Sequence, residues 1–185
     1  LQAAFEASRL VVAILVLDNY EEMMKAGGDA GRSSIQAQVD ERLGAWVAGT
    51  GAMLRKYNRD RYFLICDAQC FDSLVEGKFS VLESIHQVVS ADGVTASLSI
   101  GAGRDCADYE SACQWAEKSI EMALSRGGDQ AVVHDKLDFQ FYGGRAKSAE
   151  KRSKVKSRVM AKALADLIAD AGQVYVMGHE YADMD

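Results

Sequence analysis

An unbroken run of apolar residues, LVVAILVL, occupies positions 10–17 and ends at Asp18-Asn19. Its length suits a strand better than a helix, because buried strands are short and helices usually run longer. A strand without polar alternation is typical of the interior of a sheet, where both faces are covered. The run therefore predicts a buried central strand near the beginning of the sequence.

The rest of the sequence alternates between helical and strand-like patterns, and because proline is absent, Gly, Asp and Asn mark the boundaries. Apolar spacing predicts helices at 33–48, 71–89 and 109–125, and a run of Ala, Lys, Leu and Asp predicts a long helix at about 145–171. Strands are predicted at 52–57, 61–66, 94–102, 131–134, 137–142 and 173–177. This order predicts an α/β sandwich in which helices flank a mainly antiparallel sheet.

Charge and hydropathy narrow the class of protein. A formal net charge of -6 argues against a general nucleic-acid binder, because such proteins usually carry a basic surface. The four cysteines form no CxxC pair and are interpreted as reduced thiols of a cytosolic domain. The sequence contains no apolar stretch of membrane-spanning length and no signal peptide. It begins without Met, so any membrane anchor is expected in segments that precede Leu1.

Four segments, taken in their order and spacing, resemble the GGDEF fold, the palm-like α/β sandwich of diguanylate cyclases. They are the end of the first strand with its turn (15–20), a hairpin tip (57–62), a Ser-Ile-Gly strand (98–101) and the last helix with its glycine-rich exit (116–130). The resemblance covers residues 10–134. It implies a central sheet flanked by helices, with a hairpin between two of the helices.

The metal-binding carboxylates of that family are only partly present. In the family two carboxylates hold the metal ions, because Mg²⁺ prefers hard oxygen ligands. The first of them falls at Val16, which cannot coordinate a metal, whereas Asp60 keeps the second. Asp18 lies two residues beyond Val16 on the same strand face, so weak cation binding there is a candidate replacement. Alternatively, Asp18 and Asp60 are only turn residues, since aspartate suits turns.

Other features of a working cyclase are also replaced. Asn58 and Arg59 stand where two glycines let substrate phosphates approach the hairpin backbone, and their side chains obstruct that approach. Met24 stands where the family has an Asn that reads guanine, and no Arg-x-x-Asp motif precedes the hairpin. The resemblance therefore implies a degenerate domain without diguanylate cyclase activity.

Residues 174–185 (VYVMGHEYADMD) resemble the opening motif of DHH-family phosphoesterases, an apolar strand followed by Gly-His-x-x-x-Asp-x-Asp. In that family the imidazole and carboxylates hold paired Mn²⁺ ions that activate water for attack on phosphorus. The resemblance implies that His179, Asp183 and Asp185 are part of such a metal site, which ligands beyond residue 185 complete. The 185-residue chain alone is then expected to lack phosphodiesterase activity. The alternative is a chance His and two Asp in a polar tail.

A degenerate GGDEF domain followed by a DHH start resembles the membrane-anchored, GdpP-type cyclic-di-AMP phosphodiesterases of bacteria. The resemblance implies a GGDEF domain at 1–142, a linker helix at 143–172 and the start of a DHH domain at 173–185. It implies a regulatory and dimerising role in the cytoplasmic part of a cell-membrane protein. The full-length protein would hydrolyse cyclic di-AMP with Mn²⁺, act as a homodimer and bind no nucleic acid.

Two other functions fit the same resemblance. One is a weak ATPase that uses Asp18, Asp60 and Mg²⁺ at the degenerate site, since ATP hydrolysis is associated with such domains. The other is a DHH protein that acts on short oligonucleotides or polyphosphate. Val16 and Arg59 favour the regulatory role over the ATPase, and the fusion to a GGDEF domain favours it over the oligonucleotide or polyphosphate enzyme.

Overall fold

The computed structural model describes residues 9–25, 28–106, 108–136 and 138–143. The helices are α2 (Tyr20–Met23), α3 (Gly28–Val47), α4 (Ala68–Glu76), α5 (Val81–Ile85) and α6 (Tyr109–Ser125). The strands are β1 (Leu10–Leu17), β2 (Met53–Lys56), β3 (Arg61–Asp67), β4 (Leu98–Gly103), β5 (Gln130–His134) and β6 (Phe139–Gly143). They form one sheet in the order β2-β3-β1-β4-β5-β6, in which every neighbouring pair is antiparallel except β4 and β5.

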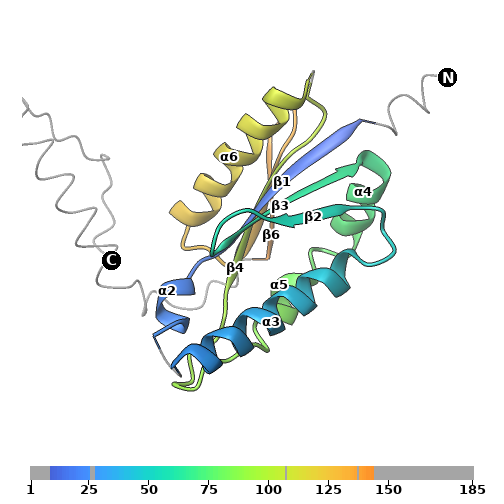
Figure 1. Ribbon diagram of the computed structural model, residues 1–185. Coiled ribbons are helices and arrows are strands. Elements are labelled where there is room, and N and C mark those ends of the chain that lie inside the picture. The colour runs from blue at the N-terminus through green and yellow to red at the C-terminus, as the bar shows by residue number, and fades with distance from the viewer. Residues whose placement is uncertain (1–8, 26–27, 107, 137, 144–185) are drawn as a thin grey trace, which may run out of the picture. The chain divides into compact units, whose positions relative to one another are not determined.

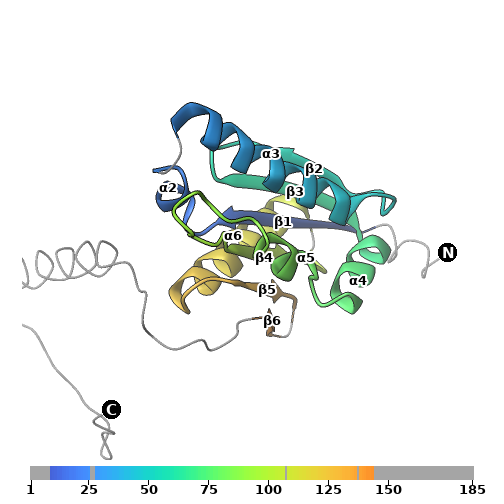
Figure 2. The ribbon, with the colours of Figure 1, turned by 90° about the horizontal axis from the view of Figure 1, so that it is seen from below.

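The sheet is covered on both faces, which explains the apolar character of β1. Helices α3, α4 and α5 lie on one face and α6 lies on the other (Figure 1), and the view from below shows the same two layers (Figure 2). Alternate residues of β1 serve the two layers: Leu15 belongs to the larger core beneath α3, and Val12 and Ile14 pack beneath α6. Burying each such side chain contributes about 1.5–3 kcal/mol, so the central strand is a main source of stability.

The predicted fold class is confirmed. The central strand at 10–17 and the helix at 109–125 have the predicted bounds, because both sequences carry an uninterrupted local pattern. The predicted hairpin is also confirmed, since β2 and β3 pair antiparallel on either side of residues 57–60. Asp108 begins α6 by accepting a hydrogen bond from the Ser111 N–H at 2.7 Å, as an N-cap aspartate is expected to do.

The single helix predicted at 71–89 is wrong. Two shorter helices, α4 and α5, are separated by a break at which Lys78 and Phe79 adopt φ values of 49° and 51°. A left-handed conformation costs a non-glycine residue about 1–2 kcal/mol. The break nevertheless buries Phe79 to 1% exposure, where its ring contacts Trp46, Phe71 and Tyr142. The two left-handed residues together cost about 2–4 kcal/mol, and burial of one phenylalanine contributes about 1.5–3 kcal/mol, so tertiary packing of Phe79 offsets most of the cost of the break.

Smaller differences concern element boundaries. The strand predicted at 94–102 begins only at Leu98, and the residues before it contribute an isolated bridge between Val89 and Thr95. Helix α2 was not predicted, because its four residues are too few to show a period. The predicted linker helix at 143–172 and the strand at 173–177 lie almost entirely outside the described residues. Within the described part of the chain, no helix has both the length and the apolar character needed to cross a bilayer.

Candidate functional site

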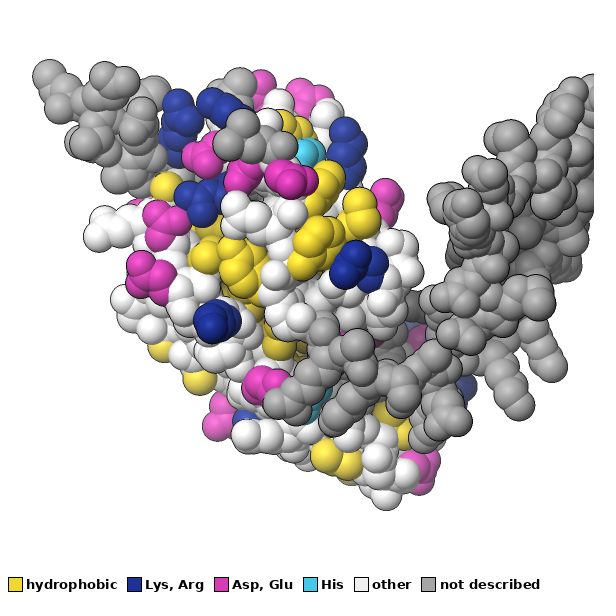
Figure 3. Space-filling model, turned by 180° about the vertical axis from the view of Figure 1, so that it is seen from behind, with side chains coloured by type: hydrophobic (Ala, Val, Ile, Leu, Met, Phe, Trp, Pro, Cys, Tyr) yellow, Lys and Arg dark blue, Asp and Glu magenta, His cyan; other side chains and the backbone are white. Residues whose placement is uncertain are grey.

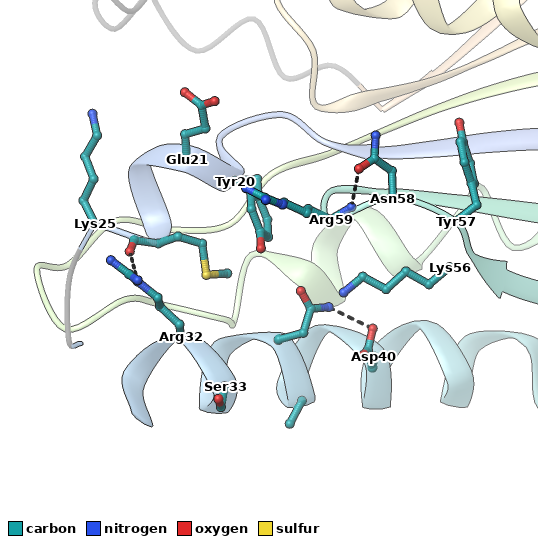
Figure 4. A pocket seen from close by; sticks show the side chains of 13 residues that line it. Tyr20, Glu21, Lys25, Arg32, Ser33, Asp40, Lys56, Tyr57, Asn58 and Arg59 are labelled. Atoms are coloured by element: carbon teal, nitrogen blue, oxygen red, sulfur yellow. Dashed lines mark hydrogen bonds between the residues drawn. The ribbon is translucent and has the colours of Figure 1, made fainter. Parts of the chain in front are cut away.

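An open pocket of about 1080 Å³ lies between α2, α3 and the tip of the β2–β3 hairpin (Figure 4). Four cationic side chains line it: Lys25, Arg32, Lys56 and Arg59. Two carboxylates, Glu21 and Asp40, line it as well, together with Tyr20 and Met24. Because cations outnumber carboxylates, the pocket favours an anionic ligand.

Beneath the pocket, the phenol of Tyr62 joins β3 to α3. Its hydroxyl donates to Asp40 Oδ1 at 2.5 Å and accepts from Gln36 Nε2 at 2.7 Å. Burial raises the pKa of Tyr62, and the Asp40 carboxylate raises it further, so the phenol stays protonated and remains a donor. The ammonium of Lys56 lies 5.5 Å from the Tyr62 ring centroid, within cation–π range. These contacts hold the strand and the helix that border the pocket in a defined position.

The tip of the hairpin is a tight turn that brings side chains to the pocket. The N–H groups of Tyr57 and Asn58 both donate to the carbonyl of Arg61, and the Asn58 side chain accepts from the Arg59 N–H at 2.7 Å. In Figure 4 the Arg59 side chain extends from the tip toward Tyr20 of α2. A glycine at this position would leave backbone N–H groups open to a phosphate, whereas here the Asn58 side chain already accepts from the Arg59 N–H.

The two carboxylates singled out in the sequence do not line this pocket. Asp18 follows β1 and its carboxylate accepts from the Asp129 N–H at 2.9 Å, on the turn between α6 and β5. Asp60 is half-buried, and its backbone carbonyl accepts from the Leu17 N–H at 2.9 Å. Val16 is 4% exposed and packs in the apolar cluster beneath α6. Among the described residues, no three or more His, Cys, Asp or Glu side chains come together in a group that could hold a metal ion.

Asp18 is a buried acid in an unusual environment. Burial raises its pKa, while the nearby Ser99 hydroxyl, the Asp129 N–H and the Ser97 hydroxyl lower it by less. Asp18 Oδ1 and Ser99 Oγ nevertheless have no hydrogen-bond partner of good geometry within the described residues. A buried acceptor in that state destabilises the folded protein, and more so when it carries a charge.

The turn that covers Asp18 depends on glycine and on a paired aspartate. Gly128 has a φ of +78°, and a Cβ at this position would lie 2.6 Å from Asp18 Oδ2. Asp129, also left-handed, is held by His86, whose Nε2 lies 2.5 Å from the Asp129 carboxylate. The glycine-rich exit of the last helix was visible in the sequence. The role of His86 was not, because its partner is 43 residues away.

Replacing Asp18 by Asn is expected to raise the free energy of unfolding at pH 7 by about 1–3 kcal/mol. The amide still accepts from the Asp129 N–H, carries no charge and supplies a donor for Ser99 Oγ. Because burial raises the pKa of Asp18 above its ordinary value of 3.8, the wild-type protein loses stability as the pH rises from that value through the folded-state pKa. The advantage of the variant should therefore shrink as the pH falls toward 4, which urea titrations across this range would measure.

Asp108→Asn is the control of opposite sign. The backbone and side chain of Ser111 lower the pKa of Asp108, so its contribution to stability is present above its ordinary pKa and is lost as the pH falls. Any loss caused by Asp108→Asn should thus be largest at neutral pH. An Asp18→Asn variant that is less stable than wild type at pH 7 would contradict the prediction, because it would show that the buried Asp18 carboxylate has the hydrogen bonds that it needs.

The family model for the GGDEF domain of GdpP-like cyclic-di-AMP phosphodiesterases matches residues 15–141. The chain is 33% identical to "Cyclic-di-AMP phosphodiesterase GdpP" of Bacillus subtilis (strain 168) and 36% identical to "Cyclic-di-AMP phosphodiesterase PdeA" of Listeria monocytogenes. Each alignment covers 100% of this chain but 28% of the relative. The chain therefore spans less than a third of the length of these two relatives.

Solved structures confirm the fold. The FimX GGDEF domain of Pseudomonas aeruginosa superposes with a TM-score of 0.59 at 16% identity, over 72% of this chain and 85% of that one. The active GGEEF domain of a diguanylate cyclase from Vibrio cholerae superposes with a TM-score of 0.60 at 8% identity, over 71% of this chain and 86% of that one. Together with the family model, which spans most of the chain, these matches show that the chain belongs to the family of GGDEF domains of GdpP-like cyclic-di-AMP phosphodiesterases.

Proposed function

We propose that this chain is a degenerate GGDEF domain that regulates and dimerises a membrane-anchored cyclic-di-AMP phosphodiesterase, and that it makes no cyclic di-GMP itself. The observation that carries the proposal is the hairpin tip, where Asn58 and Arg59 line the pocket. By the resemblance described above, diguanylate cyclases have glycine at these two positions. The relatives named as cyclic-di-AMP phosphodiesterases support the pairing with a phosphodiesterase. In this reading the domain lies on the cytoplasmic side of the membrane.

The chemistry of the pocket supports binding without cyclase turnover. Its cations suit phosphate oxygens, and Tyr20 offers an aromatic surface beside them. Cyclisation additionally needs an activated hydroxyl and neutralisation of the charge that develops at phosphorus. Val16 supplies no ligand for that purpose, and the Asp18 carboxylate is committed to the Asp129 N–H on a different turn. A domain that binds a nucleotide without converting it is suited to regulation.

Purified protein supplied with GTP and Mg²⁺ is expected to form no detectable cyclic di-GMP. Loss of a single group that stabilises developing charge commonly lowers a rate by ~10²–10³, and here a metal ligand and the open hairpin backbone are both missing. Chromatography of the reaction products would measure the outcome, with a functional GGDEF enzyme as the positive control. Cyclic di-GMP from a clean preparation would contradict the proposal.

The cationic pocket favours one alternative, a weak Mg²⁺-dependent ATPase. ATP hydrolysis in the same assay is compatible with the absence of cyclase activity, so both products should be followed. Asp60→Asn distinguishes ATP hydrolysis at this site from hydrolysis elsewhere, because Asp60 is the carboxylate that the resemblance to diguanylate cyclases assigns to the metal. ATP hydrolysis that is unchanged in this variant would place the activity at another site or in a contaminant.

A further inference from the structure

The two edges of the sheet differ in chemistry. An edge strand presents unpaired N–H and C=O groups, and proteins commonly protect such an edge with charged side chains. At one edge, β2 (MLRK) carries Arg55 and Lys56, both exposed. At the other edge, β6 (FQFYG) carries no charged residue. Within the described residues, β6 pairs only with β5, so its outer edge has no strand beside it.

Strand β6 is held firmly from both of its faces. On the α6 side, Phe139 stacks on His134 with ring centroids 4.1 Å apart, and the guanidinium of Arg126 lies 4.3 Å from the Phe141 ring centroid. On the opposite side, Tyr142 contacts Phe79 at 5.2 Å. These contacts fix the strand in an extended conformation, so an added strand would meet an ordered template.

One exposed apolar side chain, Phe141, lies on this edge strand. Phe141 remains 43% exposed in spite of its contact with Arg126. Strand β6 lies at the back of the view in Figure 1, and in Figure 3, seen from behind, hydrophobic side chains gather near the middle of the face. An apolar edge strand with free backbone groups is the kind of surface to which another extended strand adds.

We propose that a second copy of this chain adds its own β6 antiparallel to β6, which joins the two six-stranded sheets into one. This inference rests on the proposed dimerising role and names the surface that carries it. A two-fold axis through the middle residue, Phe141, would place the two Phe141 rings side by side, and aromatic cross-strand pairs are favourable. Pairing through β2 would instead bring Arg55 and Lys56 of each copy close to the same charges of the other. The charge pattern therefore selects β6 as the self-pairing edge.

The test is the association state of the 185-residue chain, measured by sedimentation over about a hundredfold range of concentration. The wild-type chain should form dimers, and Phe141→Lys should raise the dissociation constant at least about tenfold, because it removes the aromatic pair and opposes two ammonium groups. Tyr57→Lys is the matched control, since Tyr57 is 54% exposed and adjoins the opposite edge strand, and it should leave the dimer unchanged. A monomeric wild-type chain, or a Phe141→Lys variant that dimerises as well as wild type, would overturn the proposal.

Amide hydrogen exchange of the wild-type chain gives a second measurement that needs no variant. The β6 amides that point away from β5 should become protected as the concentration rises, whereas the outward amides of β2 should not. Protection of these outward β6 amides that is independent of concentration would show that another part of the chain covers this edge, and the proposal would fall.

The interface and the regulatory function can be separated in a longer protein that carries the whole phosphodiesterase. If Phe141→Lys abolishes the dimer but leaves cyclic-di-AMP turnover unchanged, the β6 interface is supported and the proposed regulatory role is contradicted. If the variant still forms a wild-type dimer, the interface is wrong, whatever the turnover.

Discussion

Alanine at Gly101 is expected to destabilise the protein by about 3 kcal/mol or more, one of the two largest effects that we anticipate. Helix α6 crosses β4 at this glycine. A Cβ there would lie 2.2 Å from the Ile120 backbone nitrogen, 2.6 Å from the Ala116 carbonyl oxygen and 2.7 Å from the Ile120 Cα. All three are backbone atoms, so no side-chain rotation relieves the clash and the whole helix must move away from the sheet. Thermal unfolding should show a melting temperature lower by roughly 10 °C or more.

Gly44→Ala is the matched control for this prediction. Gly44 is exposed in α3, and a Cβ there would meet nothing within 4 Å. The same substitution should therefore raise stability by about 0.5–1 kcal/mol, because alanine is the better helix former. Equal melting temperatures for wild type and Gly101→Ala would show that α6 does not approach β4 as closely as described.

In a longer protein that continues past residue 185, His179→Ala or Asp183→Ala is expected to abolish cyclic-di-AMP hydrolysis while the fold and the dimer persist. The sequence motif predicts that both side chains bind the metal directly. Loss of even the groups that only orient metal ligands lowers affinity or activity 10- to 100-fold, so loss of a ligand itself should exceed about a hundredfold. These residues lie outside the described part of the chain, so the prediction rests on the motif alone.

Glu180→Ala tests the specificity of that motif. Glu180 occupies one of the three variable positions between His179 and Asp183, so its replacement should leave turnover within a few-fold of wild type. Turnover of cyclic di-AMP with Mn²⁺ by the three variants is the deciding measurement. Undiminished turnover in His179→Ala or Asp183→Ala would mean that the terminal motif is a coincidence, and the phosphodiesterase assignment would have to be withdrawn.

Elements with an uninterrupted local pattern could be predicted from the sequence. The apolar run of β1 and the helical period of α6 each extend over the whole element, so their bounds followed directly. The hairpin followed from two short strand-like runs around Asn58-Arg59-Asp60. These patterns depend on which side chains face the core, and that periodicity is a property of the sequence itself.

Part of the pocket was also accessible from the sequence. Asn58 and Arg59 were identified as residues that change a nucleotide site, and both line the pocket. Lys56 was not identified, although alternation along β2 places it on the same face as Leu54, toward α3. Arg32 was not identified either, because it lies on a separate helix. Its side chain is held at the pocket by a hydrogen bond from Arg32 Nε to the Met24 carbonyl at 2.7 Å.

The sequence by itself determined the layers of this protein: one central apolar strand, a hairpin, and a helix that must cover the strand. Only the tertiary structure decided the break at Phe79 and the surroundings of Asp18, whose partner Asp129 is 111 residues away. The physical reason is the same in both cases. A local pattern records which residues prefer burial, but the energy of a left-handed backbone or a buried carboxylate depends on the particular atoms that surround it. Those atoms come from distant segments, and only folding brings them together.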